Sequence, residues 1–181
     1  QIESNPLAGI RHAFDNPIKG HMPSISPSEL PELMLTLSRA SIHLTTRCLI
    51  EWQLHTMTRP GEAAGARWNE IDLEAGLWSL SAERMKMRRG HTIPLTPQAL
   101  ALLEVIRPIS ARSEFVFPSV SSLKKHVNES TANVALKRMG FGGRLVAHGL
   151  RSIASTALNE QGFSSDLVEA ALAPTDKNAV R

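Results

Sequence analysis

The stretch EIDLEAGLWSLSAERMKMRRGHTIPLT, residues 70–96, decides the fold, because its pattern changes from a helical period to alternation. Alternating apolar and polar residues predict short strands near residues 71–73, 77–80 and 91–95. Residues 74–76 suit a turn, and the basic stretch AERMKMRRG connects the second strand to the third. We therefore expect a small three-stranded antiparallel sheet.

The sequence on both sides of this sheet predicts helices. Ser26 and Glu29 form a capping box, and Pro27 suits the first helical position. The stretch EFVFPS predicts a short extended segment. The expected helices run from Ser26 through Leu37, from about Ser41 to Thr56, from Pro60 for a short distance, from Thr96 to near Pro108, from about Ser122 to Met139, from Ala147 to Gly162, and from Ser164 or Ser165 to Pro174. The fold class is α+β, mainly helical, with one small sheet.

Composition limits the class of protein. A chain of 181 residues with 42% apolar residues is long enough for one globular domain with a real core. We find neither a signal peptide nor an apolar run long enough to cross a bilayer, and we expect no contact with a membrane. The single Cys48 fits a reducing, cytosolic setting.

The basic residues are unevenly distributed. The sequence pI is about 9.4 although the formal charge is only +3. A basic stripe suits a phosphate backbone, whereas the simpler interpretation is a solvated charged surface. The candidate DNA-binding residues are Arg84, Arg88, Arg89, Lys124 and Lys125.

Arg59 is the first candidate for chemistry. It follows a predicted helix, and Glu62 could hold its guanidinium by a fork-like pair. A fixed guanidinium is a good bidentate ligand for phosphate. Taken alone, the pattern fits a surface arginine at a helix start better, and Arg67 is a competing candidate.

His148, Arg151 and Lys86 complete the set of candidates. A spacing of three places His148 and Arg151 one helical turn apart at the rim of the core, although a satisfied histidine beside an exposed arginine fits the same spacing. Lys86 lies between two predicted strands, where a long amine can reach a ligand. As a single signal it is weak, because strand connections are commonly rich in lysine.

Three motifs in order carry a resemblance. TRPGEAAGARWNEIDL, AERMKMRRGHTIPLTPQAL and HGLRSIAST together resemble the catalytic domain of the tyrosine recombinase, or phage integrase, family, especially the integrases of satellite phages and genomic islands. The similarity runs from about Pro23 to Arg181. Any one motif would be unspecific, whereas the ordered set is a strong signal.

The resemblance implies a role for each candidate. Arg59 and Arg151 match the two arginines that clamp the scissile phosphate, and Lys86 matches the lysine that protonates the leaving 5′ oxygen. His148 matches a histidine that assists proton transfer, and Glu62 an acidic residue that supports the site. In this family a tyrosine attacks the phosphorus and forms a 3′-phosphotyrosine link to DNA, so no metal or cofactor is expected.

Two departures from the family pattern qualify this reading. Pro174 stands 23 positions after Arg151, where the family commonly has a histidine or a tryptophan, so the site is degenerate at that position. The family's tyrosine would fall just beyond Arg181, and the sequence contains no tyrosine. We therefore expect this chain alone to bind DNA without completing cleavage.

The resemblance also implies an architecture and partners. Residues 1–25 would be a linker or arm from an N-terminal DNA-binding region, and residues 26–181 the catalytic domain, truncated before the nucleophile. The implied partners are double-stranded DNA attachment sites, other integrase subunits in a tetramer, and accessory DNA-bending proteins. The implied place is the cytoplasm of a bacterial host, at the nucleoid. The alternatives are a degenerate integrase remnant that only binds DNA or partner subunits, and a strand-passage topoisomerase.

Overall fold

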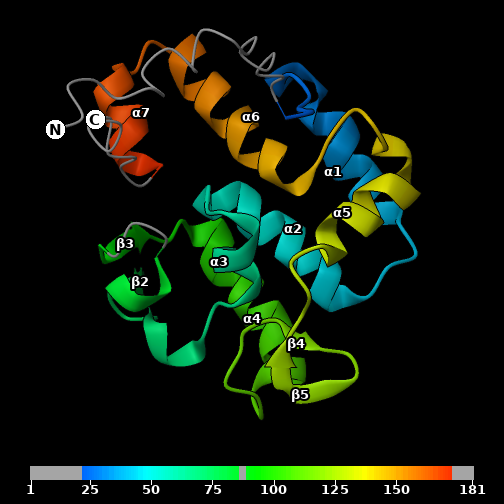
Figure 1. Ribbon diagram of the computed structural model, residues 1–181, viewed down its shortest axis with the longest axis vertical. Coiled ribbons are helices and arrows are strands. Elements are labelled where there is room, and N and C mark those ends of the chain that lie inside the picture. Colours follow the sequence, from blue (N-terminus) through cyan, green and yellow to red (C-terminus); the bar gives the residue numbers. More distant parts are fainter. Residues whose placement is uncertain (1–21, 86–88, 173–181) are drawn as a thin grey trace, which may run out of the picture.

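The computed structural model describes residues 22–85 and 89–172 and has a helical body built around one central helix (Figure 1). Helix α2 (Leu44–Thr56) packs against α3 (Pro60–Ala64), α4 (Pro97–Ser110), α5 (Thr131–Leu136) and α6 (Ala147–Glu160). Its buried residues lie on more than one face, as expected for a helix surrounded by other helices. The sequence predicted a helix here, although α2 begins three residues later than expected.

The predicted three-stranded sheet is confirmed. Strands β1 (Ile71–Asp72), β2 (Leu77–Leu80) and β3 (His91–Pro94) lie in the order β1-β2-β3, and both pairs are antiparallel. Trp78 of β2 is fully buried, and its ring centroid lies 5.0 Å from that of Trp52 on α2. This aromatic contact fixes the sheet against the helical body.

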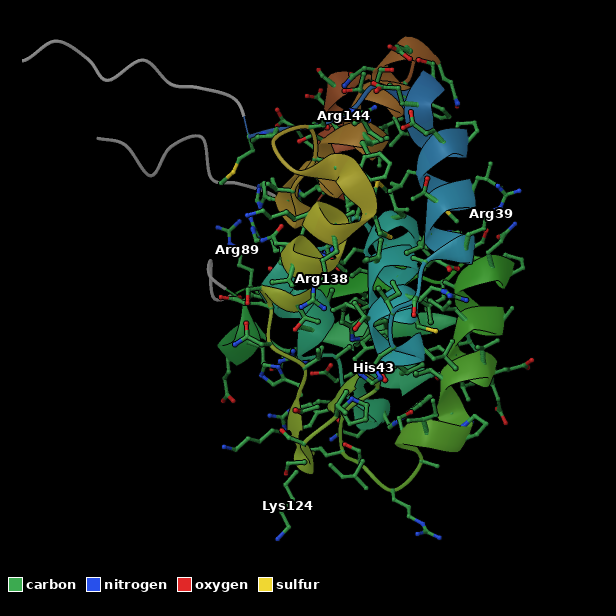
Figure 2. All side chains as sticks on the ribbon, turned by 90° about the vertical axis from the view of Figure 1, so that its right-hand side faces the viewer. Arg39, His43, Arg89, Lys124, Arg138 and Arg144 are labelled. Carbon is green, nitrogen blue, oxygen red and sulfur yellow. The ribbon has the colours of Figure 1, made fainter. Side chains whose placement is uncertain are left out.

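The predicted helix from Ser122 to Met139 is wrong in its first half. Residues there form a hairpin of β4 (Pro118–Ser119) and β5 (Ser122–His126), and α5 begins only at Thr131. Asn128 accounts for the late start, because its side-chain Oδ1 accepts the backbone N–H of Ser130 at 2.8 Å and so favours a turn. Lys124 lies on the hairpin and points away from the body (Figure 2).

The elements toward the C-terminus follow the prediction closely. Helix α4 begins at its Thr96 cap and continues through Pro108 to Ser110, two residues further than expected. Helix α6 ends before Gly162, which has a φ of +82° and stops the helix as predicted. Helix α7 (Ser165–Ala171) begins after Ser164, also as predicted. Pro174, the predicted end of this helix, lies outside the described residues.

The N-terminal edge of the domain lies slightly before the expected boundary. Helix α1 (Leu30–Arg39) buries Leu33 and Leu37, in agreement with the apolar repeat. Ile25 is also part of the core, with 6% of its surface exposed, so the packed domain includes residues that we expected in the linker. Every described helix is too short or too polar to span a bilayer.

Candidate active site

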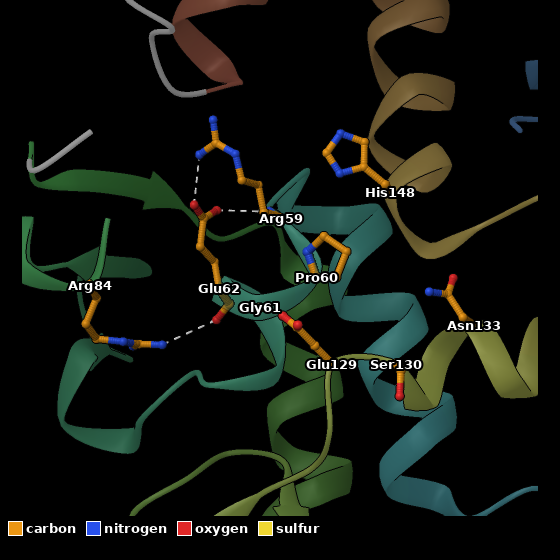
Figure 3. A pocket seen from close by; sticks show the side chains of 9 residues that line it. All are labelled: Arg59, Pro60, Gly61, Glu62, Arg84, Glu129, Ser130, Asn133 and His148. Atoms are coloured by element: carbon orange, nitrogen blue, oxygen red, sulfur yellow. Dashed lines mark hydrogen bonds and ion pairs between the residues drawn. The ribbon is translucent and has the colours of Figure 1, made fainter. Parts of the chain in front are cut away.

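Arg59 and Glu62 form a compact unit at the start of α3. The Glu62 carboxylate accepts the Arg59 backbone N–H and the Arg59 Nη1–H, each at 2.9 Å (Figure 3). The sequence suggested that Glu62 would accept two bonds from the guanidinium, but one of its two bonds comes from the Arg59 backbone instead. Glu62 is 8% exposed and Arg59 is 22% exposed, so a buried carboxylate holds a guanidinium at the surface. Pro60 at the first helical position favours this local geometry.

Arg151 is held by contacts that cross the fold. Its Nη1 donates to the Met57 carbonyl at 2.9 Å, and its Nη2 donates to the Leu172 carbonyl. Met57 ends α2 in the left-handed region, with a φ of +53°, which turns the chain toward Arg59. Arg151 therefore connects the ends of α2 and α7 to the helix that carries it.

A cleft of about 480 Å³ brings several candidates together. His148 on α6 faces Arg59 and Pro60 across this cleft (Figure 3). The lining residues are Arg59, Pro60, Gly61, Glu62, Arg84, Glu129, Ser130, Asn133 and His148. Four separate segments thus meet at one opening: residues 59–62, Arg84, residues 129–133 and His148. The opening is large enough to admit a phosphodiester group.

The charges around the cleft act on His148. Burial, together with the positive charges of Arg151 and Arg59, lowers the pKa of the imidazole, while Glu62 opposes the shift. Burial and the positive charge of Arg59 also lower the pKa of Arg151, and the negative charge of Glu62 opposes that shift. A histidine with a lowered pKa is mainly neutral at pH 7, and can therefore accept a proton.

His91 is a residue near this site that sequence reasoning did not select. It opens β3 opposite Leu80 and shares the inward face of the strand with the buried Ile93. Burial lowers the pKa of His91, and the same charges as for His148 act on it: Glu62 opposes the shift, while Arg151 and Arg59 add to it. Strand alternation was the signal that could have identified its inward orientation.

The predicted DNA-binding residues have different surroundings. Arg84 is paired with the carboxylate of Glu70, and its Nη2 lies 3.5 Å from the Glu62 carbonyl. Its guanidinium is therefore partly occupied by contacts within the protein. Lys124 and Lys125 are exposed on β5. Arg89 is exposed on the side of the molecule shown at the left of Figure 2.

Some site predictions fall outside the described part of the chain. Lys86, the predicted general acid, and Arg88, a predicted DNA contact, lie in residues 86–88. Pro174 lies in residues 173–181. The competing candidate Arg67 is paired with Glu114, its guanidinium lies 5.4 Å from the ring centroid of Phe115, and it does not line the cleft. The structure thus brings together Arg59, Glu62 and His148 at the cleft.

Comparison with known proteins decides the family. The model of the phage integrase family matches residues 23–181, which is most of the chain. The chain belongs to the phage integrase family of tyrosine recombinases. This integrase-family chain is 57% identical over 180 residues to the prophage integrase IntA of Escherichia coli strain K12. It is 33% identical over 195 residues to the integrase of enterobacteria phage P4.

The alignments include almost all of this chain but less than half of each relative. The matches to IntA and to the phage P4 integrase each include 99% of this chain but only 44% of the relative. The chain therefore spans less than half the length of these relatives.

Solved structures share the fold of the integrase-family chain. A lambda integrase fragment, solved as a dimer bound to a COC′ core site, matches with a TM-score of 0.70 and 20% identity over 97% of this chain and 62% of that one. XerA recombinase matches with a TM-score of 0.68 and 16% identity over 88% of this chain and 57% of that one. At these identities the likeness establishes the fold, including the small sheet beside a helical body.

Within the described residues, no three His, Cys, Asp or Glu side chains come together as a metal ion would require. The cleft presents arginine, histidine and carboxylate groups. Such groups can bind anions and move protons.

Proposed function

We propose that this chain carries the phosphate-binding and proton-transfer part of a site-specific DNA recombinase that cleaves and rejoins strands through a 3′-phosphotyrosine. The observation that supports it most is the Arg59–Glu62 unit facing His148 across one cleft. A guanidinium fixed by a buried carboxylate is ready to bind a phosphate without first being ordered.

In this proposal, Arg59 and Arg151 both bind the phosphodiester. A guanidinium has five N–H donors, and the contacts of Arg59 and Arg151 with the protein leave donors on each for a ligand. Attack on phosphorus gathers negative charge on the non-bridging oxygens. Cations placed beside these oxygens stabilise that charge more in the transition state than in the ground state.

The proposed reaction balances without an external reactant. A tyrosine oxygen attacks the scissile phosphorus, its proton passes to a base, and a bond between the tyrosine oxygen and phosphorus forms as the bond to the 5′ oxygen breaks. Lys86 donates a proton to the departing 5′ oxygen, and His148, kept mainly neutral, assists proton transfer. The reverse steps rejoin the strands, so the phosphotyrosine conserves the bond energy.

The nucleophile and the partners also belong to this proposal. We place the tyrosine beyond Arg181 and expect the 181-residue chain to be inactive in cleavage by itself. The whole protein would act on double-stranded attachment sites as a tetramer, with accessory DNA-bending proteins, in the cytoplasm at the bacterial nucleoid. The lambda integrase neighbour, which was solved as a dimer on DNA, supports DNA and a second subunit as partners.

A covalent-trapping experiment tests the enzyme. A chain extended past Arg181 to include the next encoded tyrosine is mixed with a nicked duplex carrying its attachment site, and a detergent-stable protein–DNA adduct is measured. We expect the wild type to form the adduct and Arg59→Ala to lose it by about 100-fold or more, because one transition-state donor is worth that much. Arg112→Ala, an exposed arginine outside the cleft, is the matched control.

The same experiment separates the second candidate function. Pro174, where the family commonly has a histidine or tryptophan, favours a remnant that only binds DNA or partner subunits. Reading the gene past codon 181 gives a first answer, because an immediate stop supports the remnant. An extended wild-type chain that binds the duplex but never forms an adduct would overturn the enzyme proposal.

A further inference from the structure

Residues 23–25 lie against the first turn of α6, and we call this segment the strap. The Val146 backbone N–H donates to the Pro23 carbonyl at 3.2 Å, and the Ser24 hydroxyl donates to the Gly149 carbonyl at 3.0 Å. Ile25 follows directly and is buried in the core. The strap is therefore bonded to the start of α6 and anchored in the body immediately afterwards.

Gly149 leaves the room that the strap occupies. A Cβ atom at this position would overlap the Pro23 carbonyl oxygen and would also lie 3.2 Å from Leu145 Cδ1. The obstruction on the strap side is backbone, which cannot turn aside as the end of a flexible side chain can. Glycine at 149 is thus explained by close approach of two chain segments that are far apart in the sequence.

The residue beside Gly149 is the cleft histidine. His148 occupies the same turn of α6, and its side chain faces Arg59 (Figure 3). On another side of this turn, Asn133 Oδ1 accepts the Ala147 backbone N–H at 2.7 Å. The beginning of α6 is therefore held by the strap and by α5, which together limit how the helix can roll or shift.

We infer that the strap and Gly149 are positioning elements for His148 and Arg151, because the strap is bonded directly to the helix turn that carries the imidazole. The catalytic meaning of this coupling rests on the proposed recombinase function. The physical contact does not depend on that function. A displacement of the strap would move the carbonyl and amide groups that bracket His148, and the imidazole would move with them.

Stability and histidine titration test the positioning in the 181-residue chain. In an unobstructed helix, Gly→Ala raises stability because alanine has the higher helix propensity. We expect Gly149→Ala to lower the melting temperature instead. In NMR titration we expect its His148 pKa to rise toward the ordinary value, because the imidazole leaves its partly buried place beside Arg151 and Arg59. Thr156→Ala, an exposed change on the same helix, is the control and should leave the His148 titration unchanged.

Ser24→Ala keeps the test decisive if Gly149→Ala does not fold. This variant removes one hydrogen bond from the strap to α6 and adds no atom. We expect it to fold, to shift the His148 titration in the same direction by less, and to leave DNA affinity unchanged. A higher melting temperature for Gly149→Ala, or an unchanged His148 titration in Ser24→Ala, would overturn the positioning role.

Cleavage kinetics in the tyrosine-containing chain give a readout that a purely structural role would not change. Misplacement of a catalytic group by a remote substitution can reduce a rate by about 10- to 100-fold, so we expect a loss of that order in single-turnover adduct formation for Gly149→Ala. The duplex Kd should stay the same. A raised Kd with an unchanged single-turnover rate would contradict the inference. If the wild type forms no adduct, the proposed function fails, while the titration and melting results still decide whether the strap positions His148.

Discussion

The two arginines of the site are held in opposite ways. Arg59 is fixed by Glu62, three residues further along the chain, within the capping geometry of a single short helix. Arg151 donates to the carbonyl of Met57, 94 residues away in the sequence, and to the carbonyl of Leu172 at the C-terminal end of α7. The guanidinium of Arg59 is therefore supported by local sequence, whereas that of Arg151 is supported by the assembled fold.

This difference indicates where the site is sensitive. The Arg59 unit depends on a few adjacent residues, so its geometry should survive changes elsewhere in the domain. The α6 side depends on the end of α2, on α7 and on the strap. Its geometry should respond to changes in each of those segments, because each contributes a contact to the helix or to its arginine.

The largest expected effect compares the loss of each arginine. Arg59→Ala and Arg151→Ala should each lower adduct formation in the tyrosine-containing chain by about 100- to 1,000-fold, since each removes a transition-state donor. Amide hydrogen exchange in the 181-residue chain should distinguish them. Arg151→Ala should speed exchange in α7, because the Leu172 carbonyl loses its partner, whereas Arg59→Ala should leave α7 unchanged. Equal exchange rates in α7 for both variants would contradict the view that only Arg151 is held by contacts with distant segments.

A smaller effect is expected when the charge of the local unit is removed. Glu62→Gln should weaken the contact with Arg59 and lower the free energy of unfolding by about 1 kcal/mol. The negative charge of Glu62 raises the pKa of both His91 and His148, so its loss should lower both pKa values further. NMR titration of the two imidazoles measures this shift, and Glu74→Gln, an exposed carboxylate, is the control. An unchanged or raised pKa at both histidines would contradict this electrostatic coupling.

The smallest effects concern the other predicted DNA-binding cations, Lys124 and Lys125 on β5 and Arg84 at the edge of the cleft. If Lys124 and Lys125 contact phosphates, changing each to glutamine should reduce the slope of log K against log salt by about 0.9. Arg84→Gln should chiefly lower stability, because it leaves the Glu70 carboxylate, 11% exposed, without its charged partner, with only the N–H groups of Arg67 and Trp78 bonded to it. Duplex titrations at several salt concentrations, with melting curves, measure both. If Arg84→Gln reduced the salt slope by about 0.9 and left stability unchanged, the pairing of Arg84 with Glu70 would be unimportant for stability.

Local patterns predicted much of the fold. Alternation identified all three strands of the sheet, and the positions of Pro60, Thr96, Gly162 and Ser164 identified ends of helices. The helix predicted after Ser122 was wrong in its first half because a short exposed strand has little alternation of buried and exposed residues. The pairing of this strand with β4 depends on contacts that sequence periodicity does not reveal.

The sequence by itself determined the Arg59–Glu62 unit, the one-turn spacing of His148 and Arg151, and the family to which the ordered motifs belong. Tertiary structure decided that His148 faces Arg59 and that the carbonyls of Met57 and Leu172 hold Arg151. It also decided that the charges of Arg59, Arg151 and Glu62 act on the pKa of His91, and that Gly149 accommodates the strap. The reason is physical. Capping and helical spacing act between residues a few positions apart, whereas close approach and shared electrostatic fields exist only once the distant segments have packed.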